Sequence, residues 1–178
     1  MINTDWQSLG DVQYRKWVVY DEMEWGDFDL DSCIICGAPY GGPLAVVRDE
    51  KKLVEAEKDL TPTLRIFSSS GRLLAEIPWE HKGLVGLGWS DQEALIAVFS
   101  DGGALVHDLH GRLLSSFNLL QDLAGLDLVA LVEARFWGDG VAALGDDQQV
   151  YAAAGVHARF PRLYSVATGL TREAPATA

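Results

Sequence analysis

The sequence has little of several things that would quickly assign it to a class. In 178 residues there are two cysteines, and 14 Lys or Arg stand against 26 Asp or Glu, a formal net charge of −12. Two cysteines without a glycosylation sequon indicate reduced thiols in the cytosol. So acidic a surface repels phosphate backbones and anionic head groups, which disfavours direct binding to nucleic acid or to a membrane through basic residues.

Long hydrophobic runs are also missing. No apolar stretch approaches the roughly 18 residues of a membrane helix. The segment Met1–Trp6 has neither a basic nor an apolar region of a secretory signal. Hydrophobic residues nevertheless make up 48% of the chain, enough for a packed core. We therefore expect a soluble protein, not inserted into a membrane, that forms one domain or a fragment of a larger one.

What the sequence does contain is a repeat. The segments 68–77 and 108–117 both run from a polar turn through Gly-Arg-Leu-Leu into a second strand-like stretch. Gly71 and Gly111 stand where a hairpin needs a positive φ, which glycine adopts without steric cost. A hairpin that recurs at roughly forty residues is typical of a β-propeller blade.

The surrounding pattern extends this unit. The sequence predicts an all-β fold, an incomplete WD-repeat-like β-propeller of about three four-stranded antiparallel blades, over residues 1–165. Residues 166–178, rich in Ala, Thr and Pro, are predicted to be a disordered tail. Trp89 and Trp137 stand at similar points of successive units, so we expect both to be buried between blades. Three blades cannot close a ring, so we expect marginal stability or self-association.

Cys33-x-x-Cys36 resembles half of a zinc site. A complete site needs two more ligands at matching spacing, and there is no second cysteine pair. On a strand, positions i and i+3 point to opposite faces, so the two thiols should diverge. We expect ordinary buried thiols here.

Asp27-x-Asp29-x-Asp31 resembles the start of a calcium loop. The sixth position should be glycine but is Ser32, and the twelfth should be glutamate but is Ala38. A solvated acidic loop is the preferred interpretation.

Two glycine-containing stretches also fail as chemical motifs. The stretch 88–92 lacks the closing glycine of a nucleophile elbow and lies between strands, so Ser90 is expected to begin a turn through side-chain bonds to the backbone. Gly37–Gly42 lacks the Lys-Ser/Thr and the helix of a phosphate loop, and is expected to turn sharply on the propeller rim. We thus predict no catalytic, cofactor-binding or metal-binding residue. Among six Trp and five Tyr, we expect one or two on the rim to anchor a partner.

A series of short stretches occurs in the same order as in a known family, over about residues 5–155. They are Trp6…Leu9-Gly10-Asp11…Tyr14-Arg15-Lys16, Ala38-Pro39-Tyr40-Gly41-Gly42-Pro43, Phe67-Ser68-Ser69-Ser70-Gly71, Leu87-Gly88-Trp89-Ser90, Asp101-Gly102, Leu109-His110-Gly111 and Ala134-Arg135…Gly140-Val141-Ala142. Together they resemble the N-terminal domain of the vacuolar protein sorting-associated protein 16 family.

The resemblance implies a non-catalytic core subunit of the HOPS and CORVET tethering complexes, without a cofactor. Its implied partners are other vacuolar protein sorting subunits and, indirectly, Rab GTPases and SNAREs. Its implied location is cytoplasmic and peripheral on endosomal, vacuolar or lysosomal membranes, through the complex. The family's α-solenoid, which contacts the Sec1-type SNARE-binding subunit, does not follow within these residues, so that partner is not carried over.

Two alternatives stay open. The chain could be a truncated gene product without an independent role, which sequencing of the transcript beyond the codon for Ala178 would decide. It could also be a propeller hydrolase, whose channel mouth would need metal-binding carboxylates, Asn and His. Asn3 and Asn118 are the only asparagines, which argues against this second alternative.

Overall fold

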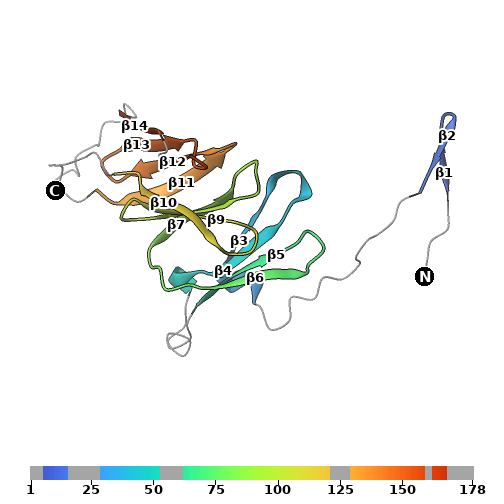
Figure 1. Cartoon of the computed structure of the whole chain (residues 1–178), viewed down its shortest axis with the longest axis horizontal. Coiled ribbons are helices and arrows are strands. Elements are labelled where there is room, and N and C mark those ends of the chain that lie inside the picture. The colour runs from blue at the N-terminus through green and yellow to red at the C-terminus, as the bar shows by residue number, and fades with distance from the viewer. Residues whose placement is uncertain (1–5, 16–28, 53–61, 121–128, 159–161, 168–178) are drawn as a thin grey trace, which may run out of the picture.

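The computed structural model describes residues 6–15, 29–52, 62–120, 129–158 and 162–167, and these ranges are built mainly from antiparallel β-strands (Figure 1). The helical elements within them are short 3-10 turns, none of which could cross a membrane. The strands are β1 (Gln7–Leu9), β2 (Val12–Tyr14), β3 (Cys33–Gly37), β4 (Leu44–Arg48), β5 (Thr63–Phe67), β6 (Leu73–Pro78), β7 (Leu84–Trp89), β8 (Leu95–Phe99), β9 (Gly103–His107), β10 (Leu113–Asn118), β11 (Leu131–Trp137), β12 (Gly140–Gly145), β13 (Gln149–Ala154) and β14 (Arg162–Ala167).

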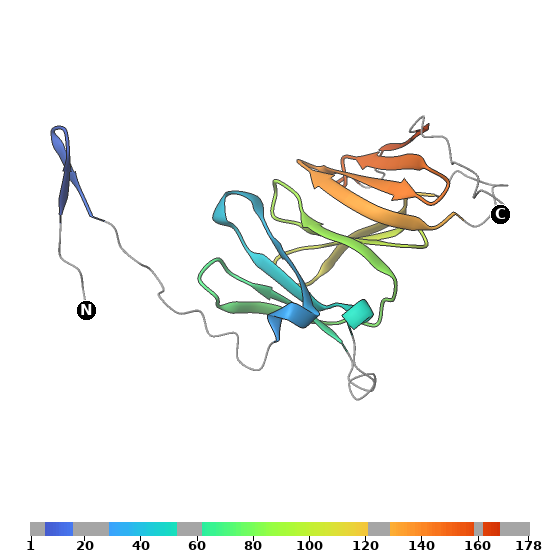
Figure 2. The same cartoon turned by 180° about the vertical axis from the view of Figure 1, so that it is seen from behind.

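Strands β3 to β14 form three four-stranded sheets, in each of which neighbours in sequence are neighbours in space. We call them blade 1 (β3–β6), blade 2 (β7–β10) and blade 3 (β11–β14). The first strands come together, since β7 contacts both β3 and β11, and the three sheets follow one another face to face (Figures 1 and 2). The prediction of an all-β fold with about three antiparallel propeller blades is confirmed. The hairpin β1–β2 is a separate sheet that stands apart in both views.

The predicted tail begins within β14, which extends to Ala167; residues 168–178 lie outside the described part of the chain.

The two hairpins that share a sequence pattern, 68–77 and 108–117, also share the same turn structure. Gly71 and Gly111 have φ of 79° and 78°, as predicted from their place in the turn. In each turn the glycine N–H donates to the carbonyl three residues earlier, Ser68 at 2.9 Å and Asp108 at 3.0 Å. The side chains of Ser68 and Asp108 also accept the N–H of the arginine four residues on. The repeat in sequence is therefore a repeat of turn chemistry.

Two apolar clusters lie between the blades. One joins blades 1 and 2, and the other joins blades 2 and 3. Strand β8 contributes to both, because alternate side chains of a strand point to opposite faces. Leu95, Ala97 and Phe99 face blade 1, while Ile96 and Val98 face blade 3. All five residues of β8 are buried, which explains why its sequence is continuously apolar.

The glycines of β7 are explained by the strand beside it. A Cβ built on Gly86 would lie 2.7 Å from the Cβ of Ala134, and one built on Gly88 would overlap the ring of Phe136. Side chains at these positions would separate β7 from β11 and open the second cluster. Glycine is needed here for close approach and not for a special φ.

The predicted equivalence of Trp89 and Trp137 is wrong. Trp89 is 5% exposed, whereas Trp137 is 48% exposed. The pairing of β7 with β8, and that of β11 with β12, each contain a register shift near the start of the first strand. The first pair after that shift is Gly86–Val98 in blade 2 and Glu133–Leu144 in blade 3. Counted from there, Trp89 corresponds to Phe136. Trp137 is one residue further on and points to the opposite face.

Candidate interaction surfaces

The two cysteines lie on β3 and do not converge. Cys36 packs in the cluster between blades 1 and 2, while Cys33 belongs by alternation to the other face of the strand. Both thiols are free and half-buried, less enclosed than the predicted buried thiols. Desolvation by burial raises the pKa of Cys36 to about 12, outweighing the opposing hydrogen bonds to Trp89 and Ala45. The Cys36 thiol is therefore protonated at neutral pH, a poor nucleophile and a poor metal ligand.

In the segment that resembles a calcium loop, Asp29 has a structural role within its own turn. The carboxylate of Asp29 accepts the N–H of Asp31 at 3.2 Å and so caps the turn Leu30–Ser32. Asp27 lies outside the described residues. Across the described ranges, no three or more His, Cys, Asp or Glu side chains gather as a metal site would require.

Ser90 is 1% exposed and closes the turn between β7 and β8. Its hydroxyl oxygen accepts the N–H groups of Gln92 at 3.3 Å and Ala94 at 3.2 Å. The expectation that Ser90 begins a turn through side-chain bonds is confirmed.

The turn between β3 and β4, residues 38–43, presents one aromatic side chain to solvent. Tyr40 has φ of 61° and is 98% exposed. Gly41 follows with φ of 77°, while Gly42 has φ of −75°. Backbone bonds close the turn, from the Ala38 N–H to the Pro43 carbonyl at 2.8 Å and from the Gly42 N–H to the Pro39 carbonyl at 3.3 Å. A bulky side chain at positive φ is an outlier that the fold must support.

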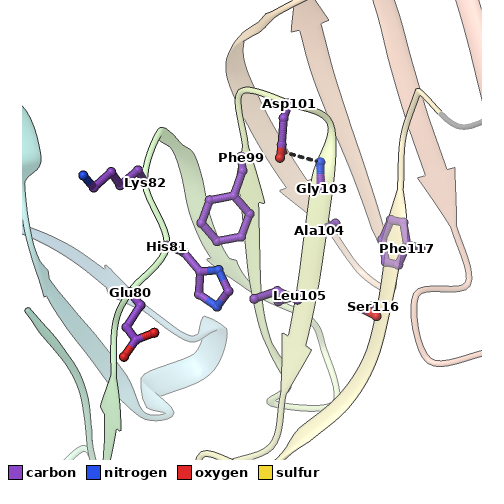
Figure 3. Close-up of a pocket in the computed structure, with 10 residues that line it drawn as sticks. All are labelled: Glu80, His81, Lys82, Phe99, Asp101, Gly103, Ala104, Leu105, Ser116 and Phe117. Carbon is purple, nitrogen blue, oxygen red and sulfur yellow. Dashed lines mark hydrogen bonds between the residues drawn. The ribbon is translucent and has the colours of Figure 1, made fainter.

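A hollow of about 460 Å³ lies beside the outer half of blade 2 (Figure 3). The connection from β6 to β7 forms one wall with His81, whose ring centroid is 5.2 Å from that of Phe99. Ser116 lies on the other side of the hollow, so no serine–histidine pair is formed there (Figure 3). Sequence reasoning missed this hollow because its residues come from four separate segments and share no motif. The lining residues are Glu80, His81, Lys82, Phe99, Asp101, Gly103, Ala104, Leu105, Ser116 and Phe117.

Blades 1 and 3 each leave one face uncovered by another described blade. On blade 3 this face includes Trp137, Tyr164 and Val166, which are 48%, 51% and 64% exposed. On blade 1 the corresponding side carries Ile35, 43% exposed, and an ion pair between Arg65 and Glu76 at 2.6 Å. The four inner faces, by contrast, are covered by the two interblade clusters. Exposed apolar side chains grouped on one sheet face, as on blade 3, are typical of a surface that contacts a partner.

The architecture is that of consecutive β-propeller blades. In agreement, the β-propeller domain of Cps50 (Swd1) from Myceliophteria thermophila superposes with a TM-score of 0.53 at 15% identity, over 83% of this chain and 41% of that one. At this identity the likeness shows the fold alone.

The sequence family described as Vps16, N-terminal region, matches residues 2–173, and the chain belongs to this family. Protein VACUOLELESS1 of Arabidopsis thaliana is 38% identical over 84% of this chain. The vacuolar protein sorting-associated protein 16 homolog of Drosophila melanogaster is 35% identical over 85% of it. The aligned parts are 17% and 18% of those two proteins, so the chain spans under a fifth of the length of these relatives.

Proposed function

We propose that the chain is the propeller part of a non-catalytic scaffold subunit, which acts in vesicle tethering and fusion at the endosome, vacuole or lysosome. The proposal rests on membership of the Vps16 N-terminal family, which covers residues 2–173. The proposed partners are other vacuolar protein sorting subunits of HOPS and CORVET, with Rab GTPases and SNAREs engaged indirectly. The proposed location is cytoplasmic, on the membrane surface through the complex.

Local structure supports a scaffold over an enzyme. The three motifs that resemble chemistry have structural roles: Ser90 closes a turn, Asp29 caps another, and Cys36 packs between blades as a neutral thiol. A catalytic serine needs a base within hydrogen-bond reach, and the Ser90 hydroxyl is instead directed at two backbone N–H groups. We propose that blades 1 to 3 act as one propeller unit within the domain predicted over residues 1–165, and that the residues after β14 are a tail.

Co-purification tests the proposal. The full-length protein, tagged in its own source, should co-purify with other vacuolar protein sorting subunits and should support normal vacuole morphology. The variant Cys33→Ser/Cys36→Ser and the variant Ser90→Ala should do the same at normal abundance, because no chemistry is lost. Failure of the unmodified protein to co-purify, or failure of these variants at normal abundance, would contradict a scaffold role. Stoichiometric zinc or calcium in the purified protein would favour the hydrolase alternative.

A further inference from the structure

The turns that end the first strand of each blade meet at one end of the molecule (Figures 1 and 2). A Cβ on Gly42, in the turn of blade 1, would lie 3.1 Å from the carboxylate of Glu93 in the turn of blade 2. The Asp91 N–H in turn donates to the Gly138 carbonyl of blade 3 at 2.8 Å. These contacts join residues 38–43, 90–94 and 138–139 into one surface, which we call the inner turn rim.

Tyr40 is the prominent feature of this rim. Its side chain is 98% exposed, so it contributes almost nothing to the core, yet its backbone holds a φ of 61° that a tyrosine disfavours. The flanking Pro39 and Pro43 restrict the loop, so little conformational entropy remains to be lost when a partner binds. An exposed aromatic side chain on a restricted loop suits an interface anchor, because Tyr, Trp and Arg are enriched among the residues that dominate binding.

The charge around Tyr40 has one sign. Asp91, Glu93 and Asp139 are exposed on the inner turn rim, and its described residues include no Lys or Arg. Basic residues stand on the outer turns of the same end, where Arg112 is paired with Asp108 at 3.2 Å. A cationic segment lying on the rim would thus meet both the exposed ring of Tyr40 and the carboxylates of the same surface. An anionic lipid surface would be repelled by the same carboxylates.

We propose that the inner turn rim is a docking site for a lysine- or arginine-bearing segment of another protein subunit, with Tyr40 as its anchor. The proposal rests on the scaffold function proposed above and names the surface that function would use. The cationic side chain stacks on Tyr40, and Asp91 and Glu93 fix its position.

The decisive variant is Tyr40→Asn in the full-length protein. Asparagine tolerates positive φ better than tyrosine does, so the melting temperature should stay the same or rise. Affinity for the purified partner subunits should nevertheless fall at least tenfold, because the ring is gone. Tyr40→Phe keeps the ring and should bind within about threefold of the parent. A merely structural role of Tyr40 would predict the reverse pattern, with Tyr40→Asn fully competent.

Charge is tested separately. Asp91→Asn/Glu93→Gln should weaken binding and reduce its salt dependence, whereas Glu80→Gln, an exposed carboxylate beside the hollow of blade 2, should change neither. A carbodiimide, which joins carboxylates directly to lysines, should link Asp91 or Glu93 to a lysine of another subunit in the assembled complex. Normal affinity of Tyr40→Asn, or unchanged affinity and salt dependence of Asp91→Asn/Glu93→Gln, would overturn the proposal; a carbodiimide link to a lysine would identify the partner segment. If the unmodified protein does not assemble at all, the scaffold function itself fails instead.

Discussion

Replacing Trp89 by alanine is the sharpest test of the blade architecture. The side chain is 5% exposed within the cluster that joins blades 1 and 2, and its Nε1–H donates to the Cys36 carbonyl at 3.1 Å. Truncating a buried aromatic residue typically costs about 3–5 kcal/mol. Leaving the Cys36 carbonyl without its donor adds about 1 kcal/mol or more. The sum approaches the whole stability of a small domain, about 5–15 kcal/mol.

Two further variants make the result interpretable. Trp89→Phe keeps most of the apolar contact and loses the donor, so it should cost about 1–3 kcal/mol. Trp137→Ala removes a side chain that is 48% exposed and should cost less than about 1 kcal/mol. Denaturant unfolding, followed by far-ultraviolet circular dichroism, gives the three free energies on one scale.

The expected order of damage is Trp89→Ala, then Trp89→Phe, then Trp137→Ala. If Trp89→Ala does not accumulate as soluble protein, the order of the other two still tests the assignment. A Trp89→Ala protein that unfolds at the same denaturant concentration as the parent would refute the burial of Trp89 between blades. A larger loss for Trp137→Ala than for Trp89→Phe would refute the register that equates Trp89 with Phe136.

Four other outcomes are expected. Gly88→Ala places a Cβ against the ring of Phe136 and should cost about 1–3 kcal/mol in denaturant unfolding. Gly41→Val should cost about 1–2 kcal/mol through its φ of 77° alone, because nothing lies within 4 Å of its Cβ position; an unchanged unfolding midpoint would contradict this. Burial lowers the pKa of His107 below 6.5, so the unfolded chain binds the proton more tightly, and stability should fall as the pH drops below about 6.5. His107→Gln should reduce that pH slope, as unfolding at pH 7.5 and pH 5 would show. Because blades 1 and 3 leave faces open, size-exclusion chromatography should show self-association of the isolated chain or a low melting temperature; a monodisperse monomer that melts high would contradict this.

The sequence predicts the blade count because turn chemistry is local. Gly71 and Gly111 need a positive φ wherever the sheet lies, so the repeat of their hairpins identifies the unit without any tertiary information. The buried strand β8 is recognised in the same way from its continuous apolar run. These signals depend only on neighbours in the chain.

Which residues correspond between blades cannot be predicted from such local signals. Trp137 and Phe136 are adjacent aromatic residues at the end of β11, and either could occupy the position of Trp89. The register shift near the start of β11 decides between them, since one extra residue sends each side chain to the other face. No local signal in the sequence reveals that shift, so the sequence pattern places Trp137 in the interface where the structure places Phe136.

The sequence predicts one or two aromatic residues on the rim as anchors without saying which, and the anchoring role of Tyr40 stays a prediction. The sequence suggests that some aromatic residue of the rim remains free for a partner, and a tyrosine between proline and two glycines is an unusual turn residue. The φ of 61° and the 98% exposure of Tyr40 are properties of the folded turn that no residue pattern specifies.

The two interblade clusters share one kind of contact, which the outer face of blade 3 does not allow. In each, an aromatic side chain of the later blade lies against a small residue in the first strand of the earlier one: Trp89 against Cys36, and Phe136 against Gly88. By register, the position of Cys36 and Gly88 is taken in blade 3 by Arg135, whose guanidinium pairs with Glu133. An aromatic ring cannot enter there without displacing a charged pair. The position that is small in blades 1 and 2 therefore carries a charged side chain in blade 3, so the three blades are not interchangeable despite their common hairpin.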